Sequence, residues 1–246
     1  MRAVVFDLDG TLTESKTPID AEMAGLLARL LRVARVAVIS GGGWLQFDAQ
    51  LLARLPASAL LRNLSILAAC GTQLRAFEDG WVERYRLEIP RADRDRIVTA
   101  LKDSFGLCGF DGLPSWGERI EDRGSQVTLS ALGQRAPLEE KKRWDLDAHK
   151  RQAIAASARV LLPDFSVRLG GTTSIDVTPL GVDKAFGIAK LESELDMEAA
   201  EMLFVGDALG PGGNDQPVRS TGAICIEVRD PGETKRVIEA VLACLG

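Results

Sequence analysis

The chain contains five short apolar runs, and these runs strongly limit the folds that it can adopt. They span residues 2–8, 35–40, 64–69, 201–206 and 223–228. Continuous apolar runs of this kind are typical of strands buried on both faces, as in a parallel sheet. Amphipathic helical patterns at 20–33 and 183–195 lie between them, and Asp20 stands where a helix N-cap is expected. The alternation predicts an α/β fold with a doubly wound parallel sheet.

The middle of the chain follows a different pattern, in which apolar and polar residues alternate. Such alternation is typical of half-exposed antiparallel strands. Alternating stretches span 82–89, 124–132 and 167–177, and helical patterns span 90–106 and 145–162. Gly170 and Gly171 mark a bend between paired strands in the last alternating stretch. We therefore expect an α+β insertion over residues 84–178, within a split core formed by residues 1–83 and 179–246.

The composition argues against several classes of function. The 246-residue chain has a formal net charge of −5, whereas a general nucleic-acid binder usually carries a basic surface. No apolar stretch approaches the roughly 18 residues that a membrane span requires. The four cysteines show no CxxC spacing, so we expect reduced thiols in a cytoplasmic protein. The single histidine, His149, is expected at the surface, and its being alone argues against a histidine-rich metal site.

Polar residues follow three of the apolar runs, at the point where each predicted strand ends. Asp7 and Asp9 follow the first run, Ser40 follows the second, and Asp207 follows the fourth, with Asp215 eight residues later. In an open parallel sheet, ligands bind beyond the carboxyl ends of the strands. Clustered carboxylates repel one another unless a positive charge lies among them. A hard cation such as Mg²⁺ would bind their oxygens and leave coordination positions for a phosphate.

These residue types suit phosphoryl transfer without a histidine. Asp7 would attack phosphorus, and Lys184 at a helix start would offset the phosphoryl charge. Asp9 lies on the same side of an extended strand and would protonate the leaving group and then activate water. The Ser40 hydroxyl and backbone N–H groups would hold the phosphoryl oxygens. We assign Thr11, Gly41 and Gly42 to substrate binding.

Each of these signals also has a plain structural explanation when it is taken alone. Asp-x-Asp-Gly and Gly-Gly-Asn-Asp can be turns, Ser-Gly-Gly-Gly can be a loop, and most lysines are exposed. Their joint occurrence, in this order and each after a strand, favours a functional site. A nucleotide-binding Rossmann protein would carry Gly-x-Gly-x-x-Gly after the first strand, and this chain does not. A two-component receiver does not fit the insertion or the Gly-Thr pair directly after Asp9.

Four motifs together resemble the haloacid dehalogenase (HAD) superfamily of Mg²⁺-dependent phosphotransferases. They are FDLDGTLT at 6–13, VISGG at 38–42, DK at 183–184 and GDALGPGGND at 206–215. The resemblance implies Asp7 as nucleophile, Asp9 as acid/base, and Ser40 and Lys184 as phosphate binders. It also implies a Mg²⁺ site formed by Asp7, the backbone carbonyl of Asp9, Asp207, Asn214 and Asp215. The insertion then corresponds to the α+β cap domain, of type C2b, that such proteins carry on a Rossmann-like core.

A closer resemblance connects four stretches to the eukaryotic-type phosphomannomutases. The stretches are FDLDGTLT at 6–13, EDRGSQVTLSALGQ at 121–134, GGTTSIDVTPLGVDK at 170–184 and FVGDALGPGGND at 204–215. This resemblance implies that Arg123, Ser174 and Asp176 contact the sugar or a phosphate. In that family the cap covers the phosphate site and selects the leaving group, and cap-mediated dimers occur, so the resemblance also suggests a homodimer.

The departures from that family pattern affect the expected outcome of the reaction. Gln134 and Lys141 stand where the family has arginines, although Arg135 lies next to Gln134. A mutase must hold a sugar bisphosphate at both ends, and arginine offers a rigid two-point grip that lysine and glutamine lack. Arg123, Arg135 and Lys141 would then form a weakened second anion site. Solvated surface charge is the plain alternative for these cations.

We therefore expect a HAD-family phosphohydrolase that removes phosphate from a small metabolite. Its substrate would be a sugar phosphate, and the reaction would pass through an aspartyl-phosphate intermediate with Mg²⁺ as cofactor. One alternative is a phosphomannomutase-like phosphotransferase that interconverts sugar 1-phosphate and sugar 6-phosphate. Another is a catalytically silent sugar-phosphate sensor, which the presence of both Asp7 and Asp9 argues against. The expected partner is a small phosphorylated substrate, with no nucleic acid and no membrane.

Overall fold

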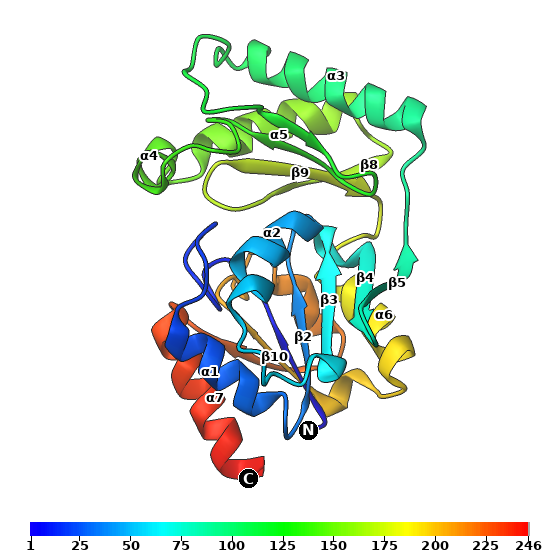
Figure 1. The fold of residues 1–246 in the computed structure, drawn as a ribbon. Helices are drawn as coiled ribbons and strands as arrows, with labels where there is room; N and C mark the ends of the chain where they lie inside the picture. Colours follow the sequence, from blue (N-terminus) through cyan, green and yellow to red (C-terminus); the bar gives the residue numbers. More distant parts are fainter. Residues whose placement is uncertain (246) are drawn as a thin grey trace. The chain divides into compact units, whose positions relative to one another are not determined.

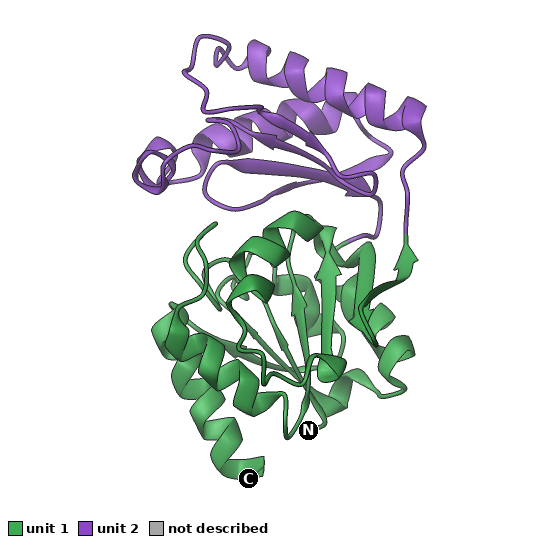
Figure 2. Ribbon diagram, in the orientation of Figure 1, with its two compact units in different colours: residues 1–86, 183–246 green, residues 87–182 purple. Residues whose placement is uncertain are grey.

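The computed structural model describes residues 1–245, which form two compact units (Figure 1). Unit 1 combines Met1–Arg86 with the chain from Asp183 onward, and unit 2 is Leu87–Val182 (Figure 2). The sequence patterns predict that the insertion spans residues 84–178, whereas the structure divides the chain after Arg86 and after Val182. The first boundary differs because the strand that ends at Arg86 pairs within unit 1.

Unit 1 is built on a seven-stranded sheet in the order β11-β10-β1-β2-β3-β4-β5. Its strands are β1 (Ala3–Phe6), β2 (Arg35–Ile39), β3 (Leu64–Ala68), β4 (Gln73–Phe77), β5 (Trp81–Arg86), β10 (Met202–Gly206) and β11 (Ile224–Glu227). The strands from β11 to β3 in this order are parallel. They coincide with the five continuous apolar runs, so the predicted parallel α/β sheet is confirmed.

Helices pack on both faces of this sheet, which explains why its parallel strands are apolar throughout. The helices are α1 (Ala21–Leu30), α2 (Trp44–Gln50), α6 (Lys184–Leu195) and α7 (Pro231–Leu245). Short 3₁₀ segments lie at η1 (Leu52–Arg54), η2 (Leu61–Asn63), η3 (Ala69–Gly71), η4 (Ala199–Glu201) and η5 (Gln216–Ser220). Within β1, Val4 and Phe6 join the apolar cluster that contains α1 and α7, whereas Ala3 and Val5 join the cluster that contains α6.

Two antiparallel strands extend the sheet beyond β3, where the sequence patterns do not predict them. β4 pairs with β3, and β5 pairs with β4 at the sheet edge. Most of the alternating stretch 82–89, which we expected to open the insertion, is therefore strand β5 of unit 1. An edge strand with mostly exposed side chains has the same alternating pattern as a strand of a small half-exposed sheet, so the pattern alone cannot distinguish them.

Unit 2 is a four-stranded antiparallel sheet in the order β6-β7-β9-β8. Its elements are α3 (Arg91–Leu107), β6 (Ile120–Asp122), β7 (Val127–Ser130), α4 (Leu138–Trp144), α5 (His149–Leu161), β8 (Phe165–Leu169) and β9 (Ser174–Pro179). Val127 of β7 and Ile175 of β9 share an apolar cluster with Ile97 of α3 and Ile154 of α5. One face of this sheet is thus covered by helices, and the paired strands predicted around Gly170 and Gly171 are β8 and β9.

Local side-chain chemistry sets where several helices begin. Asp20 accepts a hydrogen bond of 2.8 Å from the Met23 backbone N–H at the start of α1, as the sequence predicted. Asp183 caps α6 in the same way, accepting from the Ala185 N–H at 2.9 Å, so that Lys184 becomes the first residue of the helix. The helix expected from 145 begins at His149 instead, because Asp145 accepts from the N–H groups of the first helical turn.

Helix α6 approaches the end of β3 very closely. A Cβ atom at Gly71 would lie 2.5 Å from the Cα atom of Gly187, and a Cβ atom at Gly187 would lie 2.2 Å from Cδ1 of Ile39. Gly71 also has a φ of +89°, which side chains of L-residues rarely adopt. The absence of both side chains lets α6 pack against the carboxyl ends of β2 and β3.

This close packing predicts that Gly71→Ala lowers the free energy of unfolding by about 2–4 kcal/mol, because it combines a strained φ with a backbone clash. Gly25→Ala on α1 is the matched control, since no atom lies within 4 Å of an added Cβ atom there. That change should stabilise the chain by about 0.5–1 kcal/mol. Urea denaturation measures both effects. Wild-type stability of Gly71→Ala would contradict the packing described.

Candidate active site

The predicted site residues of unit 1 follow strands that lie side by side. Strand β1 pairs with β2 and with β10, and Phe6 stands opposite Val38 on one side and Val205 on the other. Asp7, Ser40 and Asp207 each follow one of these strands directly. Because parallel strands end at the same edge, the register brings these three residues to one place in unit 1.

A buried lysine connects two of the aspartates. Lys184 Nζ lies 2.6 Å from Oδ1 of Asp7 and also forms an ion pair with Oδ1 of Asp215. The lysine is only 1% exposed, and both carboxylates are buried. A buried charge is costly unless it is paired, so each of these groups depends on the other two. The sequence placed Lys184 near the site as a phosphate binder, and the structure places it in contact with the carboxylates.

Asp207 is held at the same place by the residues that follow Asp9. Its Oδ1 accepts a hydrogen bond of 3.1 Å from the Thr11 hydroxyl. A Cβ atom at Gly10 would lie 2.5 Å from Oδ2 of Asp207, so only glycine leaves space for the carboxylate there. The Gly-Thr pair of the first motif therefore holds a metal-ligand candidate from the third strand end.

Asp215 has a partner on each carboxylate oxygen. Besides the Lys184 pair on Oδ1, its Oδ2 accepts from the Ala208 backbone N–H at 3.0 Å. This hydrogen bond closes the loop between the two residues, and Asn214 lies half-buried directly before Asp215. We predicted Asp215 and Asn214 as supports for a metal ion, and Asp215 also orients the lysine.

The cluster carries uncompensated negative charge. Burial raises the pKa of Asp7 well above its ordinary value; Lys184 opposes this, while Asp215 and Asp207 raise the pKa further. Burial and Asp215 also raise the pKa of Asp207. Burial on its own would lower the pKa of Lys184, but the attraction of Asp215 and Asp7 outweighs it and raises that pKa. When all three carboxylates are ionised, the single ammonium group leaves the cluster with a net charge of −2.

A hard divalent cation fits this cluster. Carboxylate oxygens of Asp7, Asp207 and Asp215 lie within 4.8 Å of one another, and oxygen is the ligand atom that Mg²⁺ prefers. Among residues 1–245, no second group of three or more acidic, histidine or cysteine side chains has such spacing. The charge of the ion would also balance the cluster.

The predicted phosphate loop lies at the end of β2. The Gly42 backbone N–H donates to the Ser40 hydroxyl oxygen at 3.2 Å, and the Ser40 N–H donates to the Leu67 carbonyl of β3. Ser40 and Gly42 are buried and Gly41 is half-buried. The loop leads directly into α2, which begins at Trp44. A small loop with a hydroxyl and several N–H groups is suited to hold phosphoryl oxygens.

Asp9 has a separate set of partners from the buried cluster. Its Oδ2 accepts from Gln46 Nε2 at 2.8 Å, and its Oδ1 accepts from the Lys16 backbone N–H at 2.6 Å and from Gln50 Nε2 at 3.2 Å. The sequence motifs predict a role for Asp9 but not for either glutamine. Their spacing of four residues puts both on one face of a helix, yet the sequence does not reveal which face of α2 meets Asp9.

In unit 2, Ser174 and Asp176 lie on the same face of β9. Ser174 Oγ is 3.3 Å from Ser130 Oγ, and Asp176 Oδ1 accepts from the Thr128 hydroxyl at 2.7 Å. This face is opposite to the one that packs on α3 and α5, because residues alternate along a strand. Thr128 and Ser130 were not predicted, although the alternation of stretch 124–132 indicates that they share a face.

The predicted cations of unit 2 come from different elements. Arg123 lies after β6, and its Nη2 is 2.7 Å from Oε2 of Glu121. Lys141 is buried on α4, whereas Arg135 lies exposed before that helix. Their expected role as a second anion site therefore remains a prediction.

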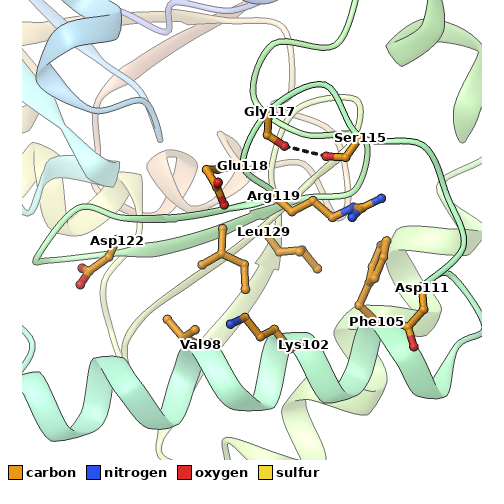
Figure 3. Close-up of a pocket in the computed structure, with 11 residues that line it drawn as sticks. Val98, Lys102, Phe105, Asp111, Ser115, Gly117, Glu118, Arg119, Asp122 and Leu129 are labelled. Carbon is orange, nitrogen blue, oxygen red and sulfur yellow. Dashed lines mark hydrogen bonds between the residues drawn. The ribbon is translucent and has the colours of Figure 1, made fainter.

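Unit 2 also contains a pocket of about 550 Å³ on the helix-bearing side of its sheet, between α3 and β6 (Figure 3). Arg119 lies in it, donating from Nε to the Ala131 carbonyl at 3.0 Å, with its guanidinium 5.2 Å from the centre of the Phe105 ring. The Ser115 hydroxyl donates to the Gly117 carbonyl at 2.7 Å (Figure 3). None of the predicted substrate-binding residues lines this pocket, and its charged side chains are of both signs.

Three simpler expectations can be compared with the structure. His149 is exposed, as expected, and hydrogen-bonds to Asp147. The four cysteines form no disulfide in the part of the chain that the structure describes. Within residues 1–245, every helix is too short or too polar to span a bilayer.

Comparison with known proteins identifies the family. The family model described as eukaryotic phosphomannomutase matches residues 113–244, which is more than half of the chain. This chain belongs to the eukaryotic phosphomannomutase family. A probable phosphomannomutase of Caenorhabditis elegans is 27% identical over 97% of this chain and 94% of its own length. Phosphomannomutase 1 of Homo sapiens is 26% identical over 86% of this chain and 80% of its own length.

Solved structures agree on the fold of this phosphomannomutase-family chain. A haloacid dehalogenase-like hydrolase from Bacteroides thetaiotaomicron superposes with a TM-score of 0.63 at 17% identity, covering 98% of this chain and 99% of its own. An IMP-nucleotidase of Plasmodium falciparum superposes with a TM-score of 0.74 at 16% identity, covering 100% of this chain and 71% of its own. The predicted HAD superfamily and its Rossmann-like core with an α+β cap are confirmed, and the chain is a HAD-family enzyme.

The expectation of a phosphatase is wrong. The matching family model and the similar curated proteins are named phosphomannomutase, so these findings favour the phosphotransferase that we had kept as the alternative. We had given weight to Gln134 and Lys141, where arginines of the family pattern are missing. Two side-chain changes in one unit do not outweigh a similarity that extends over nearly the whole chain.

The repulsion within the cluster predicts that Asp207→Asn raises the free energy of unfolding at neutral pH without added divalent cations. The change removes one clustered charge and keeps an oxygen that can accept from Thr11. Because the pKa of Asp207 is raised in the folded state, the wild type loses stability as pH rises above the ordinary value of 3.8. The increase in the free energy of unfolding of Asp207→Asn over the wild type should therefore disappear below pH 3.8. Denaturation curves at several pH values measure this effect.

Asp48→Asn, on an exposed position of α2, is the control. It removes the same charge and should stay within about 0.5 kcal/mol of the wild type. A gain for Asp207→Asn that is equal at all pH values would show that relief of charge repulsion is not its cause.

Proposed function

We propose that this chain is a Mg²⁺-dependent phosphotransferase that interconverts a hexose 1-phosphate and the corresponding hexose 6-phosphate. Mannose is the first sugar to consider, because the relatives are named phosphomannomutases. The observation that carries the proposal is the family match over residues 113–244, which includes Lys184, Asp207 and Asp215.

Asp7 would be the nucleophile. Its carboxylate would form a bond to phosphorus while the bond from phosphorus to a sugar oxygen breaks, giving an aspartyl phosphate. The ion pair of Lys184 with Oδ1 of Asp7 would orient the carboxylate and leave Oδ2 for the attack. The lysine, buried and positively charged, would also stabilise the negative charge of the transferring group.

Asp9 would move the proton in both halves of the reaction. When a sugar bisphosphate gives one phosphate to Asp7, Asp9 protonates the leaving sugar oxygen. When the aspartyl phosphate passes to the free hydroxyl of a sugar monophosphate, Asp9 takes the proton of that hydroxyl. The bisphosphate formed must then be held in either of two orientations, so that each of its phosphates can reach Asp7.

A Mg²⁺ ion would be held by the carboxylates of Asp7 and Asp207, with Asp215 behind them and the backbone carbonyl of Asp9 as a further ligand. When bound, the ion would withdraw charge from the phosphoryl oxygens. The pKa values of Asp7 and Asp207, which are raised by burial and by mutual repulsion, support the need for a cation here.

The retention of the bisphosphate calls for a second anion site, and we assign it to Arg123, with Arg135 and Lys141 as further cations. Arg123 is the strongest of the three because its guanidinium can bind phosphate at two points. Its side chain is 8% exposed and already paired with Glu121, so it is held in a fixed position. Ser174 and Asp176 would contact the sugar hydroxyls.

The first test supplies mannose 1-phosphate, Mg²⁺ and a catalytic amount of sugar bisphosphate, and follows products by ³¹P NMR. We expect mannose 6-phosphate to form faster than inorganic phosphate, and we expect Asp7→Asn to abolish both. Release of phosphate without isomerisation in the wild type would refute the proposal. Residual activity near the wild-type level in Asp7→Asn would refute the assignment of the nucleophile.

A second prediction concerns the anion site. Arg123→Gln should lower kcat/KM for isomerisation by about 10- to 100-fold, since a lost charge-assisted contact is worth roughly 1.5–3 kcal/mol. Inorganic phosphate released per turnover should rise, because a sugar monophosphate that is held less firmly leaves before it accepts the phosphoryl group, and water then attacks the aspartyl phosphate. Arg143→Gln, which changes an exposed arginine on α4, should leave both quantities unchanged. Equal effects of the two variants would contradict the assigned role of Arg123.

A further inference from the structure

The carboxylate of Asp9 is enclosed by neutral hydrogen-bond donors. Two of its three donors are the side-chain amides of Gln46 and Gln50, and the third is the Lys16 backbone N–H. Asp7, two residues earlier, instead faces the ammonium group of Lys184. The two aspartates of one motif are therefore held by different chemistry: one by a fixed positive charge, the other by amides of helix α2.

The amide of Gln50 has only one orientation that suits its surroundings. Its Nε2 donates to Asp9 Oδ1 at 3.2 Å and to the Thr17 carbonyl at 2.8 Å. Both partners are acceptors, so the reversed amide would place its oxygen against two other oxygens. Gln50 is 3% exposed, which leaves its side chain little freedom to turn. Its donation to Asp9 is thus fixed by the surrounding chain.

Gln46 connects Asp9 to the phosphate loop. Its Nε2 donates to Asp9 Oδ2, and its carboxamide lies so close to Gly42 that a Cβ atom there would be 2.4 Å from Oε1. A larger residue at Gly42 would therefore push against the group that holds Asp9. The position of the carboxylate is coupled in this way to the loop that begins at Ser40.

We propose that Gln46 and Gln50 are positioning residues that aim the Asp9 carboxylate at the sugar oxygen that releases or receives the phosphoryl group. The inference rests on the proposed function only for the role of Asp9 as general acid and base. Oδ1 accepts two hydrogen bonds and Oδ2 accepts one, so Oδ2 is the oxygen that donates and recovers the proton. Both amides act through Asp9.

Neutral donors suit a group that must gain and lose a proton in every cycle. A lysine or arginine in their place would favour the ionised carboxylate and hinder its action as an acid. An amide hydrogen bond to one oxygen persists whether or not the other oxygen carries the proton. Because the amides already hold the Asp9 carboxylate in place, little side-chain entropy is lost at each proton transfer.

The same hydrogen bonds would also exist if the glutamines merely tied α2 to the loop after β1. The two roles differ in their dependence on the leaving group. General acid catalysis matters for a poor leaving group such as phenolate or a sugar oxygen, and matters little for p-nitrophenolate, which is stable without a proton. A distorted loop would slow the transfer from every phosphate ester to the same degree.

The experiment compares Gln46→Met and Gln50→Met with the wild type, since methionine keeps the side-chain length and removes the donor. Single-turnover phosphorylation of Asp7 by phenyl phosphate and by p-nitrophenyl phosphate is measured with Mg²⁺ by quenched flow. We expect the rate with phenyl phosphate to fall at least 10-fold in each variant, and the rate with p-nitrophenyl phosphate to fall less than about threefold. Gln152→Met, the same change at an exposed position of α5, should alter neither rate.

An equal fall with both esters, or no fall with either, would overturn the inference. Unfolding curves establish that each variant is folded; Gln46 is partly exposed, so Gln46→Met keeps the test valid if Gln50→Met does not fold. A second readout is isomerisation, in which kcat should fall while KM stays within about twofold, because neither amide is expected to bind the sugar.

The aryl esters contain no sugar, so the two proposals can fail separately. If the wild type does not isomerise the sugar phosphate, the proposed function is refuted. The positioning role is still supported if the rate of each variant falls more with phenyl phosphate than with p-nitrophenyl phosphate. If both variants isomerise the sugar phosphate at the wild-type rate and show no difference between the two aryl esters, only the positioning role is refuted. A wild type that neither isomerises the sugar phosphate nor forms an aspartyl phosphate from either ester refutes both.

Discussion

The buried ion pairs of Lys184 with Asp7 and Asp215 are the interaction on which the rest of unit 1 depends. Three charged groups out of water are stable only while all three are present and in contact. Several features described above serve that contact: the Asp183 cap that starts α6 at the lysine, and the two glycines that let this helix approach β3. The Ala208 N–H in turn fixes the second oxygen of Asp215.

Much of this could be predicted from the sequence, because the signals were local. Continuous apolar runs predicted the parallel strands, Asp20 was predicted as the cap of α1, and the strand ends predicted the positions of Asp7 and Asp207. Strand β5 was assigned to the insertion because an edge strand and a small sheet have the same polar alternation. The donors to Asp9 were missed for another reason: Gln46 and Gln50 show their role only when the face of α2 that meets the first loop is known.

The functional error has a similar origin. The motifs of unit 1 are those of phosphoryl transfer in general, and they do not decide whether water or a sugar receives the phosphate. In the proposed function that outcome would depend on the cations assigned to unit 2, and the phosphatase prediction gave two changed side chains, Gln134 and Lys141, more weight than the agreement of the remaining chain. Charge at a binding site can be supplied from neighbouring positions, so single substitutions are weak guides to a whole reaction.

Strand β1 lies between β2 and β10, although β10 follows it by about 200 residues. While the ribosome makes the protein, Asp7 therefore emerges long before the lysine that neutralises it, and β1 has an open edge until the second part of unit 1 is released. Unit 2 is continuous in sequence and forms its own apolar cluster, so it can fold while unit 1 is still half made. The order of the elements along the chain thus allows the second unit to fold before the first unit has a complete sheet.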